Sequence, residues 1–256
     1  MRKTERHRFI LKALDEEGFL SVEALSARIE TSLVTIRRDL KALDDEGLLS
    51  RVHGGAERQT TQRHTLVGRS FERNMARNRS AKRRIAARAA QLCGDGDSII
   101  VDGGTTTYEL GPHLAGRGTQ VLTNSLHIIS GLIEDPATRL IVPGGEVFAE
   151  QNIILSPSED DGISDFRAGT MFLGAEALCT DGVRQSDMLL VHAERRLLKL
   201  ATRVVLLVDS SKFEANAPLK LCELSKIDTV ITERAPPPRL ANALSEANVM
   251  TIVASK

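Results

Sequence analysis

The sequence lacks long apolar runs. No stretch approaches the roughly 20 apolar residues that a membrane-spanning helix needs. The first eight residues, M-R-K-T-E-R-H-R, also lack the apolar core of a secretory signal. These absences argue against a membrane or secreted protein, so we expect a cytoplasmic chain with no membrane partner.

Cysteine is scarce as well. The chain of 256 residues has three, Cys93, Cys179 and Cys222, which lie far apart and form no C-x-x-C motif. An odd number without paired spacing indicates neither a disulfide framework nor a zinc site. We therefore interpret the three thiols as small core residues, and we expect no metal and no cofactor.

The sequence also lacks net charge, with 34 basic and 34 acidic residues. Residues 1–90 hold 20 Lys+Arg against 12 Asp+Glu, whereas residues 91–256 hold 14 against 22. Within residues 1–58, however, the count is 11 against 11. Net charge therefore does not indicate DNA binding, and the placement of the basic side chains is more informative.

The segment from Ser32 to Leu43, S-L-V-T-I-R-R-D-L-K-A-L, is typical of a helix that binds in a DNA groove. At 3.6 residues per turn, one stripe is apolar and predicted to be buried; it comprises Leu33, Ile36, Leu40 and Leu43. The predicted DNA contacts of this helix are its N-cap Ser32 with Val34, Thr35, Arg37, Arg38 and Lys41. An arginine fork can bind guanine O6 and N7, or a phosphate, with two hydrogen bonds. The alternative is a solvated helix face.

The flanking sequence favours DNA binding. Two further amphipathic helices precede this one, around Ile10 to Leu14 and Val22 to Ile29, the latter capped by Ser21. Downstream, L-L-S-R-V-H-G-G-A alternates and ends in a Gly-Gly turn, as a β-wing does. On this wing Arg51 is a candidate for phosphate or the minor groove, and His53 is either a DNA contact or a turn residue. Residues 1–57 are therefore predicted to form a winged helix-turn-helix.

A polar, arginine-rich segment, residues 58–79, is predicted to be a linker, and residues 80–256 a second domain. Helices and strands alternate there, which indicates an α/β domain with a mostly parallel sheet covered on both faces. The expected strands are residues 98–101, 120–123, 139–142, 170–173, 204–208, 229–231 and 249–253. The expected helices are residues 81–92, 106–114, 126–134, 189–201 and 238–247.

Several predicted strands end in glycine and short polar residues. These ends are D-G-G-T-T-T from Asp102, T-N-S from Thr123, P-G-G from Pro143 and D-S-S-K from Asp209. In an open parallel sheet, ligands bind beyond the carboxyl ends of the strands, where helix N-termini favour anions such as phosphate. None of these runs is a G-x-G-x-x-G or Walker A motif. Taken singly, each run can equally be a helix cap.

The combination of T-I-R-R-D-L at Thr35 to Leu40, L-x-x-x-G at Leu43 to Gly47 and R-V-H-G-G-A at Arg51 to Ala56 resembles the DeoR family of bacterial transcriptional regulators. The resemblance covers the whole chain. It implies an N-terminal domain that binds operator DNA and a C-terminal domain, similar in fold to ribose-5-phosphate isomerase, that senses a phosphorylated sugar. The effector-binding residues that it implies are Asp102, Gly103, Gly104, Thr105, Thr106, Thr107, Thr123, Asn124, Ser125, Gly144, Gly145, Glu194, Asp209 and Lys212.

Glu194 departs from the pattern of the family, many of whose members have a lysine there. Glu194, with I-L-S-P from Ile154 and S-D-M-L from Ser186, resembles the branch that contains the L-ascorbate utilisation repressor. The resemblance therefore suggests phosphorylated ascorbate, or a related sugar acid or polyol phosphate, as the effector.

Two classes of function remain at this point. The first is a regulator, usually a repressor of a sugar or polyol catabolic operon, that binds double-stranded operator DNA as a homo-oligomer, a dimer or tetramer formed through the sensor domain. One small winged helix alone offers too few DNA contacts. The second is a sugar-phosphate isomerase or hydrolase with an accessory helical domain. Its acids and bases would be Asp102, Glu194, Asp209 and Lys212.

Overall fold

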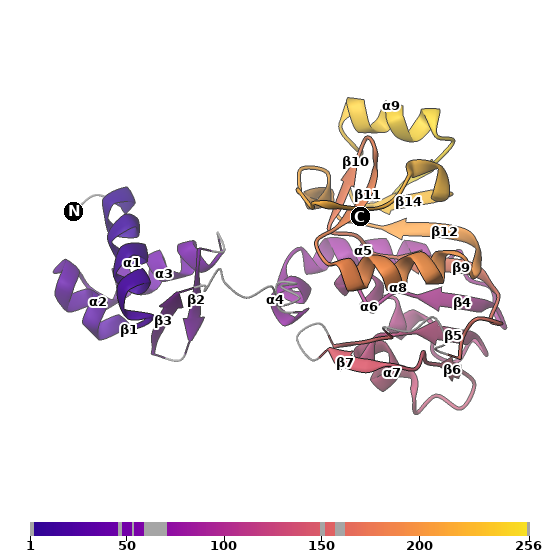
Figure 1. The fold of residues 1–256 in the computed structure, drawn as a ribbon, viewed down its shortest axis with the longest axis horizontal. Helices are drawn as coiled ribbons and strands as arrows, with labels where there is room; N and C mark the ends of the chain where they lie inside the picture. Colours follow the sequence, from indigo (N-terminus) through magenta and orange to yellow (C-terminus); the bar gives the residue numbers. More distant parts are fainter. Residues whose placement is uncertain are drawn as a thin grey trace. The chain divides into compact units, whose positions relative to one another are not determined.

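The computed structural model describes residues 3–45, 48–52, 54–58, 71–148, 152–156 and 162–254 (Figure 1). The chain divides into two compact units, residues 1–65 and residues 66–256. His53, a candidate DNA contact on the wing, lies outside the described residues. No described helix is long and apolar enough to cross a membrane.

The N-terminal unit has the winged helix-turn-helix arrangement that the sequence predicts. Its elements are α1 (Lys3–Glu17), β1 (Phe19–Ser21), α2 (Val22–Ile29), α3 (Leu33–Asp45), β2 (Leu49–Val52) and β3 (Gly55–Arg58). Strand β1 was not predicted, and it adds a third antiparallel strand, giving the order β1-β3-β2. Gly55 is required where β3 meets β1, because a Cβ atom there would overlap the carbonyl oxygen of Leu20.

Both helix caps expected in this unit are present. The Ser21 hydroxyl accepts a hydrogen bond from the Ala24 N–H at 3.0 Å, and the Ser32 hydroxyl accepts one from the Thr35 N–H at 3.2 Å. Each cap satisfies a donor that the first turn leaves without a helical partner. The caps therefore fix where α2 and α3 begin.

The apolar stripe of α3 differs from the prediction at one end. Ile36, Leu40 and Leu43 are buried, but Leu33 is 38% exposed. Leu33 is the first residue of the helix, so it lies beyond the part of the stripe that packs on the core. The other buried position on this helix belongs to Asp39, whose exposed fraction is 0%.

Asp39 joins α3 to α1 through a buried ion pair. Its carboxylate accepts two hydrogen bonds from the Arg6 guanidinium, and the His7 Nε2 atom lies 3.2 Å from the same carboxylate. Burial acts to raise the pKa of Asp39, but the hydrogen bonds from Arg6 and His7 outweigh it and lower that pKa. Asp39 is therefore a fold-determining residue inside the T-I-R-R-D-L motif.

The elements of the first half of the C-terminal unit are α4 (Phe71–Ala76), α5 (Arg79–Ala90), β4 (Ser98–Val101), α6 (Thr105–Tyr108), η1 (Gly111–His113), β5 (Gln120–Thr123), α7 (Leu126–Leu132), β6 (Arg139–Ile141), β7 (Glu146–Phe148) and β8 (Ile153–Leu155). Those of the second half are β9 (Ala168–Leu173), β10 (Ala177–Cys179), β11 (Gly182–Gln185), α8 (Met188–Leu198), β12 (Ala201–Leu207), η2 (Ser210–Lys212), β13 (Leu219–Cys222), η3 (Leu224–Lys226), β14 (Thr229–Thr232), α9 (Pro238–Glu246) and β15 (Met250–Val253).

The C-terminal unit is the predicted α/β domain with a parallel sheet. Seven strands lie in the order β15-β14-β12-β9-β4-β5-β6, and each neighbouring pair is parallel. Every predicted strand is present, with ends within three residues of those expected. Two small antiparallel sheets, β10-β11-β13 and β7-β8, were missed. Their strands of three or four residues show no alternation by themselves, whereas equally short strands of the parallel sheet were predicted from the alternation of strands and helices.

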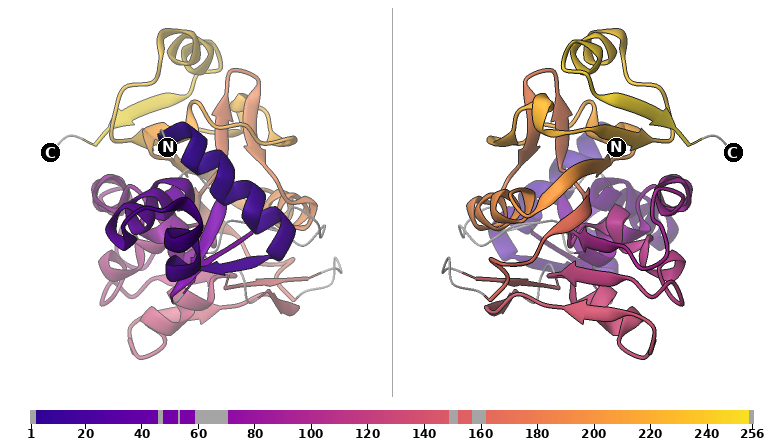
Figure 2. Two further views of the ribbon diagram at one scale, coloured as in Figure 1. Left: turned by 90° about the vertical axis from the view of Figure 1, so that its left-hand side faces the viewer. Right: turned by 90° about the vertical axis from the view of Figure 1, so that its right-hand side faces the viewer.

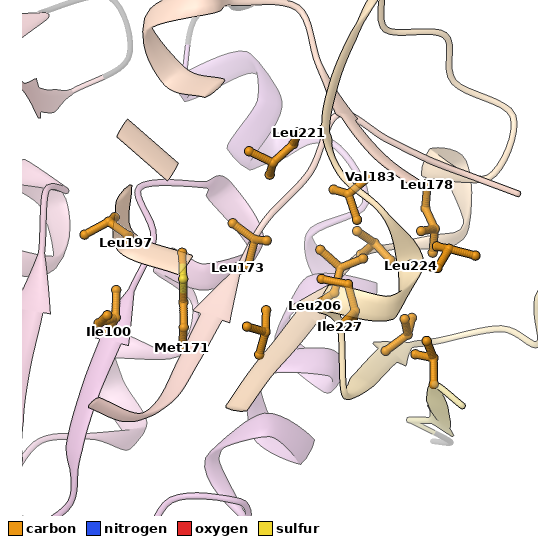
Figure 3. Packing of buried hydrophobic residues seen from close by; sticks show 14 of the residues in the cluster. Ile100, Met171, Leu173, Leu178, Val183, Leu197, Leu206, Leu221, Leu224 and Ile227 are labelled. Carbon is orange, nitrogen blue, oxygen red and sulfur yellow. The ribbon is translucent and has the colours of Figure 1, made fainter. Parts of the chain in front are cut away.

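Alternate side chains of the central strands enter opposite cores. Ile100, Met171 and Leu206 point to one face, which α8 and α9 cover (Figure 3). Val101 and Phe172 point to the other face, with α5 and α7. The sheet is therefore buried on both faces, as expected for parallel strands. Strand β15 and helix α9, in yellow, lie at one edge of the sheet (Figure 2).

Two predictions for this unit need correction. The helix expected at residues 106–114 is divided into α6 and η1, because Pro112 cannot donate the hydrogen bond that a continuous helix requires. The linker expected at residues 58–79 includes α4 and the start of α5, and its Phe71 is buried. An isolated phenylalanine among polar residues is here an anchor of a short helix.

Removal of Arg6 is expected to destabilise the N-terminal unit. In Arg6→Met the buried Asp39 carboxylate loses its guanidinium partner, and breaking such a pair costs about 3–5 kcal/mol. Calorimetric unfolding of the full chain should therefore show a lower midpoint for one transition. Arg8→Met, which changes an exposed arginine of the same helix, is the control. Equal midpoints for the two variants would contradict a stabilising role for the ion pair.

Candidate functional site

The exposed face of α3 carries the cations that the sequence assigned to DNA. Arg37, Arg38 and Lys41 are exposed, and Val34 is 74% exposed. These three cations form no ion pair with any other residue that the structure describes. Their charges are therefore available to an anionic partner such as the phosphates and base edges of a DNA groove.

Three other predicted DNA contacts, Ser32, Thr35 and Arg51, also form hydrogen bonds within the N-terminal unit. The Ser32 hydroxyl is 2.9 Å from the Thr35 hydroxyl as well as capping the helix. Arg51 is exposed on β2, and its backbone N–H donates to an Asp44 carboxylate oxygen at 3.3 Å. The exposed Arg51 side chain thus lies on a strand that is hydrogen-bonded to α3.

The second candidate site lies at the carboxyl edge of the parallel sheet. Strands β4, β9 and β12 are neighbours in register, with Val101 opposite Phe172 and Phe172 opposite Val205. Their chains therefore leave the sheet at the same edge. There the buried Asp102 carboxylate accepts a hydrogen bond from the Gly174 N–H at 3.0 Å.

A cavity of about 600 Å³ opens at this edge. Of the predicted effector residues, it is lined by Asp102, Gly103, Gly104, Thr105, Thr106, Glu194, Asp209 and Lys212. The structure thus brings together the D-G-G-T-T and D-S-S-K runs with Glu194, which come from three separate parts of the chain. Such a volume suits a small phosphorylated metabolite.

Other predicted effector residues do not line this cavity. The Thr107 hydroxyl donates to the carbonyl oxygens of Asp102 and Gly104, each at 2.7 Å, and Ser125 caps α7. The Thr123 hydroxyl accepts from the Ser125 N–H at 3.1 Å, and the Asn124 carbonyl accepts from the Ile154 N–H at 2.8 Å. For Thr107, Thr123 and Ser125 the geometry favours the capping alternative. The side-chain oxygen of Asn124 is buried and has no hydrogen-bond partner among the described residues.

The P-G-G run is also structural in this geometry. Neither Gly144 nor Gly145 lines the cavity. Gly145 has a φ of 153°, and a Cβ atom there would overlap the carbonyl of Leu155. Glycine is therefore required at this position for the approach of β8, without reference to a ligand.

Two buried carboxyl groups, those of Asp102 and Glu194, line the cavity. The side-chain amide of Gln185 donates to both carboxylate oxygens of Glu194, at 2.8 and 2.9 Å. Burial, together with the charge of Asp102, raises the pKa of Glu194 well above its usual value, although Gln185 opposes this. Burial also raises the pKa of Asp102, while N–H groups of Gly174, Gly103 and Gly104 act to lower it. Such groups can bind ligand hydroxyls.

Lys82 also lines the cavity and was missed in the sequence. It projects from α5 and is 3% exposed, and burial lowers its pKa to about 8. Among charged neighbours, Asp209 has the largest effect on this pKa, followed by Lys212 and Arg77, and all three line the cavity. Lys82, Lys212 and Arg77 together place three cations beside one carboxylate, so this part of the lining suits a phosphate.

A sequence pattern does mark Lys82. It lies on the same stripe of α5 as Ile85, Ala86 and Ala89, which are buried. A lysine on an otherwise apolar stripe is unusual, because burying an ammonium is costly without a partner.

Comparison with known proteins identifies both units. Residues 6–62 match the model of the DeoR-like helix-turn-helix domain, and residues 77–234 match that of the DeoR C terminal sensor domain. The HTH-type transcriptional regulator UlaR of Escherichia coli O1:K1 / APEC is 33% identical over 249 residues, which cover 97% of this chain and 98% of the relative.

Solved structures similar to part of the chain have low identity. Ribose 5-phosphate isomerase A from Methanocaldococcus jannaschii has a TM-score of 0.39 at 17% identity, covering 53% of this chain and 55% of that chain. The eIF2B beta of Chaetomium thermophilum has a TM-score of 0.44 at 17% identity, covering 66% and 54%. The likeness to ribose-5-phosphate isomerase that the sequence suggested is among these similarities.

The raised pKa of Glu194 gives a testable dependence of stability on pH. A carboxyl whose pKa is raised in the folded state stabilises the fold fully below its ordinary pKa of about 4.3, and this contribution is lost as the pH rises through the folded pKa. Between pH 5 and pH 8 the wild type should therefore lose at least about 1 kcal/mol more free energy of unfolding than Glu194→Gln, since each pKa unit is worth about 1.4 kcal/mol.

Urea denaturation of the full chain at the two pH values measures this difference. Glu246→Gln, an exposed position on α9, is the matched control and should behave as the wild type. A Glu194→Gln variant with the same pH dependence as the control would show that the buried carboxyl stays ionised.

Proposed function

Because the chain belongs to the DeoR family of transcriptional regulators, we propose that it represses a sugar or polyol catabolic operon under the control of a phosphorylated sugar metabolite. Membership of the family makes the chain a regulator, so an isomerase or hydrolase with an accessory domain is not retained. Its N-terminal unit is the DNA-binding domain and its C-terminal unit the sensor domain.

One observation carries the proposal for the sensor. The lining of the cavity at the sheet edge combines cations, among them Lys82 and Lys212, with buried carboxyl groups and the Gln185 amide. A phosphorylated sugar, sugar acid or polyol has groups that match both parts of this lining: a dianionic phosphate for the cations, and several hydroxyls for the carboxyl and amide groups. The phosphate binds near Lys82 and Lys212, close to the backbone N–H groups that follow Gly103, and the hydroxyls bind near Asp102 and Glu194.

The active form in this proposal is a cytoplasmic homo-oligomer joined through the sensor domain. A single winged helix with few base contacts gives too little affinity at physiological salt, and two domains on repeated half-sites supply the rest. The relative named UlaR and the local resemblance at Glu194 make phosphorylated ascorbate the first ligand to test.

Selection of DNA from a random pool by the full chain would yield the operator on which the proposal is tested. Gel-shift titrations then compare the selected sequence with random DNA. We expect Arg38→Ala to lose about 1–3 kcal/mol of discrimination between them, because a bidentate contact with a base edge disappears. Arg8→Ala, which removes an exposed guanidinium from α1, should change both affinities little. Unchanged discrimination by Arg38→Ala would exclude Arg38 from base recognition.

Calorimetry tests the effector half of the proposal. L-Ascorbate 6-phosphate should bind the wild type more tightly than L-ascorbate, since the cations of the lining then hold a dianion. Lys212→Ala should bind the phosphorylated compound at least about tenfold more weakly, because a hydrogen bond to a charged group is worth about 1.5–3 kcal/mol. Its operator affinity without ligand should stay the same.

Lys226→Ala, an exposed lysine outside the cavity, is the control for the loss of charge. If another phosphorylated sugar or polyol binds and ascorbate 6-phosphate does not, the effector is a different member of the proposed class. Equal affinity for phosphorylated and unphosphorylated members of every pair would contradict a phosphate site.

A further inference from the structure

Helix α4 forms part of the wall of the cavity. Phe71 and Asn74 of α4 line it, as does Arg77, which directly follows the helix. Helix α4 is also the first described element of the C-terminal unit, and residues 59–70 connect it to β3 of the winged helix. One short helix therefore contacts the ligand space and begins the connection to the DNA-binding unit.

A helix of six residues is too short to be stable by itself, so its position depends on contacts with the rest of the unit. The Phe71 ring stacks on His127, with centroids 4.3 Å apart, and meets the edge of Tyr108 at 5.8 Å. These rings hold the first turn of α4. The last turn is held in a different way.

The last turn is held by polar groups that face the cavity. The Lys82 ammonium donates to the carbonyl oxygen of Asn74, which lies in the last turn of the helix. A cation at this end also favours the helix dipole. Asn78, in the left-handed conformation with a φ of 54°, donates from its side-chain amide to Asp209 at 2.9 Å.

We propose that α4 is the element through which the effector acts on DNA binding, and that Lys82 is the residue that connects them. The proposal rests on the effector site proposed above. An anion in the cavity draws the Lys82 ammonium away from the Asn74 carbonyl, because a phosphate oxygen is a stronger acceptor than a neutral carbonyl. Helix α4 then loses one of the contacts that hold its last turn.

The burial of Lys82 makes this exchange selective. The side chain is 3% exposed, so its ammonium has little contact with solvent and keeps the Asn74 carbonyl as a partner until an anion enters the cavity. Lys212 and Arg77, the cations near Lys82, attract the same anion. Movement of α4 shifts the point at which the connection to the winged helix begins. Effector binding and operator binding are then coupled, typically by 5- to 150-fold in affinity.

Hydrogen–deuterium exchange of the full chain tests the release of α4, with inorganic phosphate as the probe. Saturating phosphate should raise the exchange rates of the α4 amides about tenfold in the wild type. In Lys82→Met those rates should already be raised without phosphate, and phosphate should change them no further. Arg88→Met removes a cation from α5, the helix that carries Lys82, at a position outside the cavity. In this variant phosphate should raise the exchange rates of the α4 amides as it does in the wild type.

Operator affinity gives a second readout. Lys82→Met without ligand should bind the selected DNA as the wild type does with phosphate present, whether that affinity is higher or lower than that of the free protein. Phe71→Ala, which loosens α4 from the ring cluster without removing a cation, should also raise the exchange rates of the α4 amides. This second variant keeps the test valid if Lys82→Met fails to fold.

The outcomes separate the two proposals. Phosphate that binds by calorimetry but leaves α4 exchange unchanged, or slows it, overturns the role of α4 and leaves the effector site in place. Operator affinity of Lys82→Met that still responds to phosphate like the wild type also overturns it. Absence of any phosphate binding to the wild type overturns both proposals together.

Discussion

The parallel alignment of β4, β9 and β12 is the constraint on which the C-terminal unit depends. Because the three strands run the same way and in register, Asp102, Gly174 and Asp209 follow them at one edge. Packing is close around Gly174, because a Cβ atom there would lie 3.1 Å from an Asp102 carboxylate oxygen. The backbone thus encloses the Asp102 carboxyl, and the remaining space beyond the strands is the cavity.

In the N-terminal unit, helix α3 exposes its cations and buries a carboxylate. In the T-I-R-R-D-L motif, Arg37 and Arg38 are exposed while Asp39 is buried against Arg6 of α1. The carboxylate that would partly neutralise the exposed face is therefore directed inward, where it orients the helix. A buried pair contributes to specificity of packing and is sensitive to loss of either partner. The same six residues thus fix the helix and leave its cationic surface free for DNA.

Sequence reasoning succeeded where a pattern repeats over several residues. The period of α3, the caps at Ser21 and Ser32 and the alternation of strands and helices all predicted what the structure contains. It failed where a residue's role depends on distant neighbours. The burial of Asp39 requires Arg6, and the hairpin strands are too short to show alternation. Thr107, Ser125 and Gly145 share the composition of ligand loops but serve caps and close packing, a distinction that only coordinates make.

The buried polar groups of the cavity argue that it is a ligand site and not a packing defect. Lys82, Asp102 and Glu194 are all buried, and their pKa values move toward the neutral forms, which shows that the folded state resists their charges. An apolar lining of the same volume would avoid that penalty. A ligand with a phosphate and several hydroxyls supplies partners to both kinds of group, so its binding also stabilises the folded unit by mass action. Among the described hydrogen bonds, the ammonium of Lys82 has one acceptor, a carbonyl oxygen of α4. In the mechanism that we propose, stability of the unit and the position of α4 therefore respond to the same ligand.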